Sequence, residues 1–558
     1  MNLMLKRILY NRQISTRFIN QFSKVSSRSI FESNNDDNNK NQRDGKYYKS
    51  IFIGTSLTVL LAYKLYDYRK NVVKTEHHHA QEIQNVGVAK KDLPYYSLQE
   101  VSEHSTVEKR VWVTYKEGVY DITDFIVEHP GGEQILLAAG SSVEPFWMLY
   151  AVHNNSHVLH LLENLRIGNL SKDESQDLTS DMSDPYNSDP LRHTALKAAS
   201  VKPFNAETPP FILVEQFITP NELFYVRNHL PVPHIDPETF ELEVEIEGRN
   251  KSVILTLDEL KKLPKHTITA TIMCAGNRRS EMTKIKAVKG LSWGAAAVGN
   301  ATWTGVRLRD VLKKVGVDED DKSLKHVQFE GMDFDPTGKT YGASIPLWKA
   351  LDKRGDVILA YEMNGVPIPP DHGFPIRVIV PGVVGARNVK WLGRVIVSEK
   401  ESDSHWQQND YKGFSPSTDW DTVDFTKSPA IQELPVISAI CKPLDGQTAQ
   451  VEDGTVLVKG YAWSGGGQKI IRVDVTTDGG NTWHVANLDH QDSSEPPQHW
   501  SWTLWSVRVP IKPGTTNVEI WAKAVDSCYN TQPENFKNIW NLRGVLSNAY
   551  HRVAIKLE

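Results

Sequence analysis

The polar stretch from Ser171 to Pro190 (SKDESQDLTSDMSDPYNSDP) is the feature that most constrains the fold of this 558-residue chain. It is rich in Ser, Asp and Pro and has almost no large apolar side chains. Such a segment cannot bury a core and is typical of a flexible linker. The chain must therefore fold as separate units on either side of it, and at about 150 residues per domain the length predicts three or four units.

The charge balance and the cysteine content exclude several classes of protein. Lys and Arg number 63 against 68 Asp and Glu, which argues against a nucleic-acid-binding surface over the whole chain. With 40% hydrophobic and 23% charged residues, the composition is that of ordinary globular domains rather than of a multi-span membrane protein. Three cysteines cannot build a disulfide framework. We therefore expect no nucleic-acid partner and consider each cysteine separately.

The basic residues are concentrated at the amino terminus. Residues 1–30 contain six Lys and Arg and no acidic residue, interleaved with apolar side chains. This pattern predicts an amphipathic mitochondrial presequence, with a disordered basic tail as the alternative. Residues 50–66 hold a short apolar run, IFIGTSLTVLLAY, which is shorter than the about 20 residues that span a bilayer comfortably. We interpret it as a sorting segment that delivers the protein to the mitochondrial intermembrane space, with membrane contact at most transient during import; a retained anchor is the alternative.

Two histidines lie at the ends of apolar segments within residues 92–171. His129 opens a His-Pro-Gly-Gly turn, and His153 follows it by 24 residues at the end of FWMLYAVH. Neutral imidazoles are good axial ligands for haem iron, and an apolar wall excludes water from such a site. His157 and His160 lie on the same amphipathic stretch and compete with His153 as the second ligand.

Residues 92–171 resemble the cytochrome b5 family over roughly their whole length. The resemblance implies an α+β domain that holds six-coordinate haem b between His129 and His153. A bis-histidine site has no open position on the iron, so it carries electrons rather than binding substrate. The segment 97–184 holds 5 basic and 15 acidic side chains. That charge would suit docking to a basic electron carrier, although an acidic surface need have no partner at all.

Cys274 is the cysteine with the most informative surroundings. It leaves an apolar strand and enters the loop AGNRRSE, which contains two arginines. An electropositive loop favours the thiolate, which is both a nucleophile and a soft metal ligand. Chemistry alone leaves a catalytic cysteine, a metal ligand and a buried structural thiol about equally open. Cys441 and Cys528 have no such context, and we expect them to be structural thiols.

Six motifs in a fixed order across residues 200–425 decide between these alternatives. In order they are FYVRNHLPVP from Phe224, CAGNRRSEM from Cys274, VKGLSW from Val288, DHGFPIR from Asp371, VGARNVKWLG from Val384 and DYKGF from Asp410. This part of the chain resembles the molybdenum-cofactor domain of the sulfite oxidase family. With the haem module in front, the whole chain is similar to the animal-type mitochondrial branch of that family.

The resemblance implies a role for each matched side chain. Cys274 would be the protein thiolate on molybdenum, next to the sulfurs of the cofactor's own dithiolene. The pterin and its phosphate would be held by Tyr225, Val226, Arg227, Asn228, His229, Asp333, His372, Arg377, Asn388, Val389 and Lys390. Guanidinium forks suit this task because they match a phosphate bidentately. A small oxyanion needs fixed positive charge in a partly dry cavity. We expect that charge from Arg227, Arg279 and Arg543, with Lys289, Trp293 and Tyr411 around them, and only Arg543 lies outside the matched motifs.

The region from residue 430 to residue 558 changes to short alternating strands bounded by Gly- and Asp-rich turns. This pattern predicts an antiparallel, immunoglobulin-like β-sandwich, and the resemblance assigns it to homodimerisation. The predicted organisation is therefore multidomain, with an α+β haem domain, a mixed α/β molybdopterin domain and the sandwich. The predicted boundaries are 1–30 (presequence), 50–66 (sorting segment), 92–171 (haem domain), 172–190 (hinge), 191–425 (molybdenum-cofactor domain) and 430–558 (dimerisation domain).

The activity implied by the resemblance is the two-electron oxidation of sulfite to sulfate, with electrons passed singly through haem b to cytochrome c. This is the last step of sulfur amino-acid degradation and of sulfite detoxification. One alternative is a nitrate-reductase-like enzyme, but that family places haem after the dimerisation domain and appends flavin and nicotinamide modules. Another is a haem-carrying electron shuttle whose central domain is only a scaffold. Cys274 with its arginines argues against the shuttle.

Overall fold

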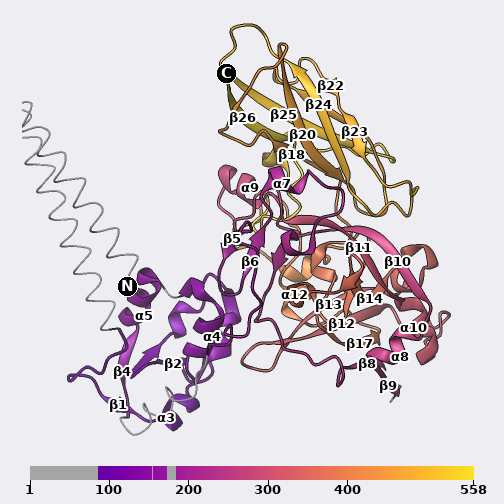
Figure 1. The fold of residues 1–558 in the computed structure, drawn as a ribbon. Coiled ribbons are helices and arrows are strands. Elements are labelled where there is room, and N and C mark those ends of the chain that lie inside the picture. Colours follow the sequence, from indigo (N-terminus) through magenta and orange to yellow (C-terminus); the bar gives the residue numbers. More distant parts are fainter. Residues whose placement is uncertain (1–85, 154, 172–183, 250) are drawn as a thin grey trace, which may run out of the picture. The chain divides into compact units, whose positions relative to one another are not determined.

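The computed structural model describes residues 86–153, 155–171, 184–249 and 251–558 (Figure 1). The predicted presequence, the predicted sorting segment and residues 172–183 of the predicted hinge lie outside the described residues. In the described ranges, none of the helices combines the length and the apolar character that spanning a bilayer requires. Those ranges form a small helix-and-sheet domain, a larger mixed α/β domain and a β-sandwich, which confirms the predicted fold class.

The amino-terminal domain is built on a four-stranded sheet of order β1-β4-β3-β2. Helix α3 begins after Ser97, whose hydroxyl forms a capping box with Glu100. Val113 of β2 and Tyr120 of β3 are fully buried, and they pack with apolar side chains of the helical segments. The elements are β1 (Tyr95–Tyr96), α3 (Leu98–Glu103), β2 (Trp112–Tyr115), β3 (Gly118–Asp121), η2 (Gly132–Ala138), α4 (Glu144–Leu149), η3 (Ala151–His153), α5 (Ser156–Asn164) and β4 (Arg166–Leu170).

Two five-stranded sheets form the central domain. The first has the order β10-β11-β14-β15, with β16 also paired to β14, and the second has the order β13-β12-β17-β8-β9. Their strands are β8 (Glu241–Ile246), β9 (Lys251–Thr256), β10 (Lys265–Met273), β11 (Val298–Arg307), β12 (His326–Phe334), β13 (Thr340–Pro346), β14 (Ile358–Met363), β15 (Val366–Pro367), β16 (Arg377–Ile379) and β17 (Leu392–Ser398). All of these pairs are antiparallel except β17 with β8.

Short helices and a small third sheet surround these two sheets. The helices are α7 (Pro210–Leu213), α8 (Leu257–Lys261), α9 (Arg279–Ile285), α10 (Leu308–Val315), α11 (Leu347–Leu351) and α12 (His405–Gln408). The third sheet holds β5 (Lys197–Ser200), β6 (Asn205–Glu207) and β7 (Val226–Arg227). Apolar side chains of α10 lie on its inner face, at Leu308, Val311, Leu312 and Val315, with the spacing that packs a helix against a sheet.

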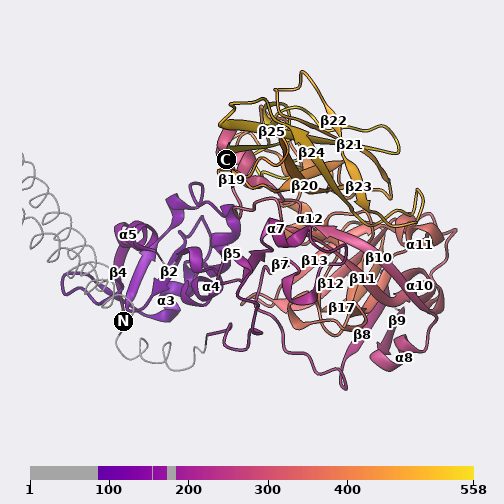
Figure 2. The same cartoon turned by 45° about the horizontal axis from the view of Figure 1, so that its top comes forward.

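The carboxy-terminal domain is a two-sheet sandwich, as its alternating pattern predicts (Figure 2). One sheet has the order β18-β20-β24-β23 and the other β19-β26-β25-β21-β22. Buried residues from both sheets, such as Val458, Trp505, Val473 and Ile520, form its core. The strands are β18 (Ile437–Lys442), β19 (Thr448–Ala449), β20 (Thr455–Trp463), β21 (Ile470–Thr476), β22 (His484–Val485), β23 (Asn487–His490), β24 (Thr503–Pro510), β25 (Asn517–Asp526) and β26 (His551–Leu557).

A second apolar core joins the sandwich to the central domain. It contains Tyr461, Trp463 and Trp502 of the sandwich together with buried residues of the central sheets. Cys441 is buried in this core, as expected of a structural thiol. The same expectation is wrong for Cys528, which is exposed in the turn after β25. The two domains therefore share buried apolar side chains.

Candidate functional site

The two candidate haem ligands face each other in the amino-terminal domain. The rings of His129 and His153 are nearly parallel, at 8°, with their centroids 6.1 Å apart. Bonds of about 2 Å from a metal to an imidazole nitrogen on each side would place the two centroids about 6 Å apart. The gap between these rings therefore fits one iron atom.

Hydrogen bonds leave the correct nitrogen of each ring available to a metal. His129 Nδ1 lies 3.1 Å from the carbonyl of Gly132, and His153 Nδ1 lies 3.0 Å from that of Tyr150. An Nδ1–H that donates to a carbonyl leaves Nε2 as the acceptor that binds iron. Burial lowers the pKa of both histidines, which favours the neutral, ligating form. Of the competing histidines, His157 is exposed on α5 and His160 is half-buried on the same helix.

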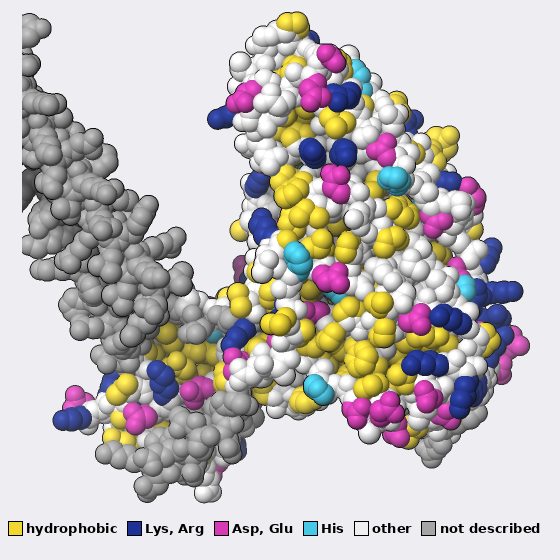
Figure 3. All heavy atoms as spheres, in the orientation of Figure 1, with side chains coloured by type: hydrophobic (Ala, Val, Ile, Leu, Met, Phe, Trp, Pro, Cys, Tyr) yellow, Lys and Arg dark blue, Asp and Glu magenta, His cyan; other side chains and the backbone are white. Residues whose placement is uncertain are grey.

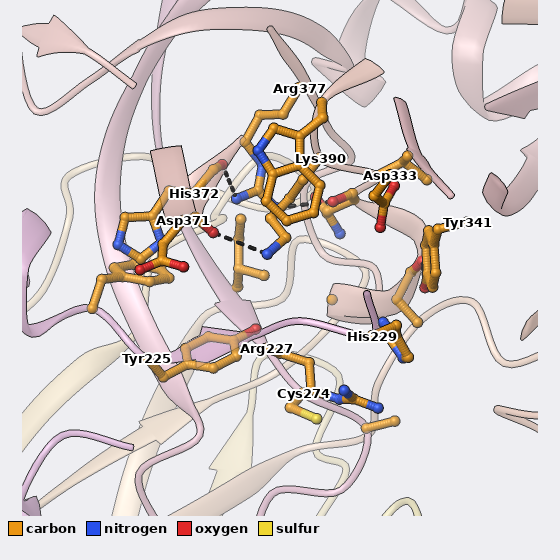
Figure 4. Close-up of a pocket in the computed structure, with 18 of the residues that line it drawn as sticks. Tyr225, Arg227, His229, Cys274, Asp333, Tyr341, Asp371, His372, Arg377 and Lys390 are labelled. Carbon is orange, nitrogen blue, oxygen red and sulfur yellow. Dashed lines mark hydrogen bonds between the residues drawn. The ribbon is translucent and has the colours of Figure 1, made fainter. Parts of the chain in front are cut away.

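The central domain contains a cavity of about 670 Å³ including its open mouth. Eleven of the predicted site residues line it: Tyr225, Arg227, His229, Cys274, Asp333, His372, Arg377, Asn388, Val389, Lys390 and Tyr411. Figure 4 shows the Cys274 sulfur beside the Arg227 guanidinium at one end of the cavity, and Arg377, Lys390 and Asp333 toward the other. The cavity therefore has a sulfur-bearing end and a more polar end.

Cys274 lies in the loop between β10 and α9 and is 6% exposed. Its backbone N–H donates to the carbonyl of Ala297, the residue before β11, at 2.9 Å. Asn277 fixes the rest of the loop, because its side chain accepts from Ala297 N–H and donates to the Tyr461 hydroxyl of the sandwich. The thiol is thus held at the cavity wall by both domains.

The neighbouring Arg278 has a structural role that the motif alone did not assign. It is fully buried and has a left-handed backbone, with φ of 64°. Its guanidinium forms a bidentate pair with Glu281, both N–O distances being 2.7 Å, and donates to the carbonyls of Ser438 and Ala549. Arg278 therefore attaches the start of α9 to the carboxy-terminal domain and does not contribute free charge to the cavity.

Arg227 has part of its guanidinium fixed by the neighbouring strand. Asn205 of β6 lies opposite Arg227 of β7 in the sheet register. The Asn205 Oδ1 accepts from Arg227 Nη1 at 3.1 Å, and the Asn228 carbonyl accepts from the same nitrogen at 2.6 Å. The position of the positive charge is therefore set before any anion arrives. Such preorganisation is what electrostatic binding of an anion requires.

Arg279 and Arg543 lie close together behind the cavity. The Arg279 guanidinium passes between Gly276 and Gly290, where an added Cβ would come within 2.5 Å and 2.7 Å of it. Arg279 Nε donates to the carbonyl of Arg543 at 3.1 Å, and Arg543 Nε donates to Asp410 Oδ1 at 3.0 Å. Burial lowers the pKa of Arg279. Neither residue lines the cavity directly, so both contribute to its field from behind its wall.

Three further predicted residues carry informative polar atoms. Trp293 is fully buried, and its indole N–H has no hydrogen-bond partner among the described residues. The Tyr411 hydroxyl lies 2.7 Å from His229 Nε2, and burial raises the Tyr411 pKa to about 12. Lys289 lies over the ring of Trp420, with its Nζ 4.1 Å from the centroid. Trp293 and Lys289 do not line the cavity, whereas Tyr411 does, and its protonated phenol is the kind of donor that a small oxyanion can use.

The polar end of the cavity has unmet hydrogen-bonding capacity. Asp333 Oδ1 and Arg377 Nε are buried without a hydrogen-bond partner among the described residues. Burial raises the pKa of Asp333 to about 7 and lowers that of Lys390 to about 7. Arg377 donates through its other nitrogens to the carbonyls of His372 and Asn388 (Figure 4). The Asp333 oxygen and the Arg377 N–H can therefore pair with a ligand that has hydrogen-bond donors, acceptors and a negative charge, such as a pterin with a phosphate.

Two residues predicted to touch the cofactor, Val226 and Asn228, do not line the cavity. They alternate with Tyr225, Arg227 and His229, which do. Successive side chains in extended chain point to opposite faces, so the alternation follows from local geometry. Asn228 still contributes from behind, because its side-chain oxygen accepts a hydrogen bond from Lys390 Nζ.

One face of the central and carboxy-terminal domains has mixed rather than concentrated charge. On the face drawn in Figure 3, basic and acidic side chains are interspersed over the central and carboxy-terminal domains. A single-sign field that steers an anion from a distance would need an extended patch of one charge. On this face, attraction of a small anion therefore depends on the arginines of the cavity.

The buried histidines predict a pH dependence of stability. His372 donates to the Asn221 carbonyl at 2.9 Å, and burial lowers its pKa from 6.5 to about 4. His372 takes up a proton near pH 6.5 in the unfolded chain but only near pH 4 in the folded chain. The free energy of unfolding therefore falls as the pH decreases from about 6.5 to about 4. We expect His372→Gln to flatten that fall in calorimetric melts of the cofactor-free protein at pH 7 and pH 5. His490→Gln, at an exposed site, is the control, and equal slopes for both variants would contradict the assignment.

Several residues at the site were not predicted from the sequence. Asn205 positions Arg227, Tyr341 stacks on His229 with ring centroids 4.6 Å apart, and Asp371 lines the cavity. Asp371 stands directly before His372 in a matched motif, so its position was a usable signal. Asn205 and Tyr341 lie outside the six motifs, and only the tertiary fold brings them to the site.

Known families and proteins match the chain along most of its length. A cytochrome b5-like haem/steroid-binding domain matches residues 97–171, an oxidoreductase molybdopterin-binding domain residues 229–406, and a Mo-co oxidoreductase dimerisation domain residues 428–558. Mitochondrial sulfite oxidase of Drosophila melanogaster is 62% identical over 84% of this chain and 82% of that protein. The Homo sapiens protein of the same name is 56% identical over 82% of this chain and 84% of its own length. The crystal structure of the sulfane dehydrogenase SoxCD from Paracoccus pantotrophus has the same fold, with a TM-score of 0.52 and 23% identity over 67% of this chain and 90% of that chain.

Proposed function

The chain belongs to the sulfite oxidase family, and from this premise we propose that the cavity beside Cys274 is where it oxidises sulfite. The protein is a mitochondrial oxidoreductase that converts sulfite to sulfate with a molybdenum–molybdopterin cofactor and a haem. Its carboxy-terminal domain makes it a homodimer. The main support for this site is that the Cys274 sulfur and the Arg227 guanidinium lie beside each other at one end of the cavity (Figure 4).

Different residues of the cavity would hold different parts of the cofactor. Cys274 would bind molybdenum through its thiolate, which is a soft ligand suited to that metal. Asp333, Arg377 and Lys390 would hold the pterin and its phosphate at the polar end, where Asp333 Oδ1 and Arg377 Nε have no hydrogen-bond partner in the part of the chain that the structure describes. When bound, the cofactor supplies oxygen-atom transfer to sulfite and takes up two electrons. The protein provides placement and charge.

Sulfite would bind at the sulfur-bearing end. Arg227 supplies a fixed positive charge there, with Arg279 and Arg543 behind the wall. Because their guanidinium groups are largely buried, these residues attract an anion more strongly than exposed arginines would.

The hydroxyl of Tyr411 can donate a hydrogen bond either to the anion or to His229. Burial keeps Tyr411 protonated at neutral pH and keeps His229 neutral, since it lowers the His229 pKa well below 6.5. The Tyr411 hydroxyl can therefore donate either to the anion or to His229 Nε2, 2.7 Å away. Conversion of sulfite and water to sulfate releases two protons with the two electrons, so a switchable donor beside the anion is useful.

Electrons would leave singly through haem b held by His129 and His153, with cytochrome c as the acceptor. The parallel rings 6.1 Å apart support the haem ligands. The 15 acidic against 5 basic side chains of residues 97–184 support a basic electron carrier as the partner. The amino-terminal charge pattern and the short apolar run support the intermembrane space as the compartment. We also propose the predicted domain boundaries, which are 92–171 for the haem domain, 172–190 for the hinge, 191–425 for the molybdenum-cofactor domain and 430–558 for the dimerisation domain.

Arg227→Gln tests the anion site directly. The substitution keeps a polar side chain but removes the positive charge beside Cys274, so sulfite should bind and react less well. We expect kcat/KM for sulfite to fall by about 10²–10³-fold, the range for losing one preorganised donor at a reacting anion. Steady-state assays on protein with matched molybdenum and haem content would measure this. Arg472→Gln, at a partly exposed pair on β21, is the control, and an unchanged kcat/KM in Arg227→Gln would contradict the placement of the anion.

A further inference from the structure

Arg192 forms a buried ion pair that the activity does not explain. Its guanidinium faces Asp371 as a fork, with Nε 2.8 Å from Oδ2 and Nη2 2.9 Å from Oδ1. A second carboxylate, on Asp189, lies 2.7 Å from Nη2, and the ring of Phe204 lies under the guanidinium at 4.2 Å. Only 14% of the Arg192 side chain and 9% of the Asp371 side chain are exposed.

Asp371 connects this ion pair to the polar end of the cavity. Its Oδ1 also accepts from Asn228 Nδ2 at 3.0 Å, and its backbone carbonyl accepts from Lys390 Nζ at 2.9 Å (Figure 4). Lys390 Nζ in turn donates to Asn228 Oδ1. Asn228 and Lys390 therefore each have two contacts in one network that begins at Arg192.

The network depends on Arg192 for charge as well as for geometry. A buried carboxylate without its cation is strongly unfavourable, so it must move, take up a proton or find another cation. The Lys390 ammonium is already bonded to the same residue through the backbone. Loss of Arg192 would therefore release Asp371 from its fixed position and draw Lys390 away from the cavity, taking Asn228 with it.

We propose that Arg192 is a positioning residue for the molybdenum cofactor, acting through Asp371 to hold Asn228 and Lys390 in place. This inference rests on the proposed function, which places the pterin and its phosphate at that end of the cavity. Arg192 stands two residues beyond the proposed hinge at 172–190. The segment that follows the proposed hinge therefore contacts the cofactor pocket indirectly, through Asp371 of its wall.

Arg192→Ala in the full-length holoprotein is the main test. We expect the rate at which molybdenum is lost during dilution and incubation to rise by between about 10- and 100-fold, the usual effect of removing an outer partner of a metal site. Molybdenum is measured per haem iron, so the haem serves as an internal count of folded protein. Arg192→Lys keeps a charge but not the fork, and an intermediate loss rate is expected.

Two further variants separate positioning from simple structural support. Asp189→Asn removes the other carboxylate on Arg192 but leaves the fork to Asp371 intact, so its loss rate should equal that of the wild type. Asp371→Asn should raise the loss rate by itself, and adding Arg192→Ala to it should have little further effect, since both act through one contact. A purely structural role would instead lower the melting temperature of the cofactor-free protein and leave the loss rate unchanged.

The possible results distinguish this inference from the proposed function. Wild-type protein without molybdenum would overturn both. Wild-type protein with molybdenum, and an Arg192→Ala variant that loses it no faster, would overturn the role of Arg192 alone. Full additivity of Arg192→Ala and Asp371→Asn would also overturn it. If Arg192→Ala does not fold, Arg192→Lys decides, because a wild-type loss rate in that variant would contradict the need for the fork.

Discussion

Cys274→Ser is expected to reduce sulfite-dependent reduction of the haem to background while leaving the haem spectrum unchanged. The hydroxyl of serine does not ionise near neutral pH, and its oxygen is a harder ligand than a thiolate, so the protein would lose its bond to molybdenum. The haem site should be unaffected because both of its proposed ligands, His129 and His153, lie in another domain. Serine is smaller than cysteine, so the buried loop should retain its fold.

The measurement is haem reduction by sulfite in a spectrophotometer, with the haem spectrum recorded before sulfite is added. Two other cysteines offer matched controls, since Cys441→Ser changes a buried thiol and Cys528→Ser an exposed one. Both controls should keep sulfite oxidation. Near-normal turnover in Cys274→Ser would refute its assignment as the molybdenum ligand.

His129→Ala should remove the haem and abolish reduction of cytochrome c by sulfite. Loss of one axial ligand leaves iron with a single protein bond in a site built for two. The molybdenum site should still oxidise sulfite once and remain reduced, because its proposed residues lie in the central domain. Iron per protein, the haem spectrum and single-turnover reduction of molybdenum by sulfite measure these effects separately.

The control for this variant is His157→Ala, which changes an exposed histidine on α5. We expect normal haem content and normal reduction of cytochrome c in that protein. Haem content equal to the wild type in His129→Ala would contradict the ligand assignment. Loss of haem in His157→Ala would instead identify His157 as the second ligand in place of His153.

The sequence predicted the fold class because each domain has a strong local pattern. The alternating strands of the carboxy-terminal region form the expected sandwich, and five of the six ordered motifs of the central domain contribute residues to one cavity. Alternation along residues 225–229 could also have separated the side chains that line the cavity from Val226 and Asn228.

Other features could not be predicted because they depend on residues far apart in the chain. Arg192 and Asp371 are 179 positions apart, and Arg279 contacts the Arg543 carbonyl 264 positions away. That the indole N–H of Trp293 finds no hydrogen-bond partner in the described ranges follows only from the positions of all its neighbours. Motifs identify which side chains matter, whereas tertiary contacts decide which nitrogen or oxygen remains available.

The carboxy-terminal domain takes part in the site as well as in dimerisation. Arg543 comes from that domain and pairs with Asp410, next to Tyr411. Arg278 attaches the Cys274 loop to the carbonyls of Ser438 and Ala549. A substitution in the sandwich that shifts these contacts would therefore also shift the Cys274 loop and Asp410, because the two domains are in direct contact.

X-ray absorption at the molybdenum edge of the purified holoprotein tests the central claim most directly. We predict three sulfur neighbours around the metal, two from the dithiolene of the cofactor and one from Cys274, with one fewer in Cys274→Ser. A wild-type spectrum that contains only two sulfur neighbours, or that has no molybdenum edge, would contradict the account.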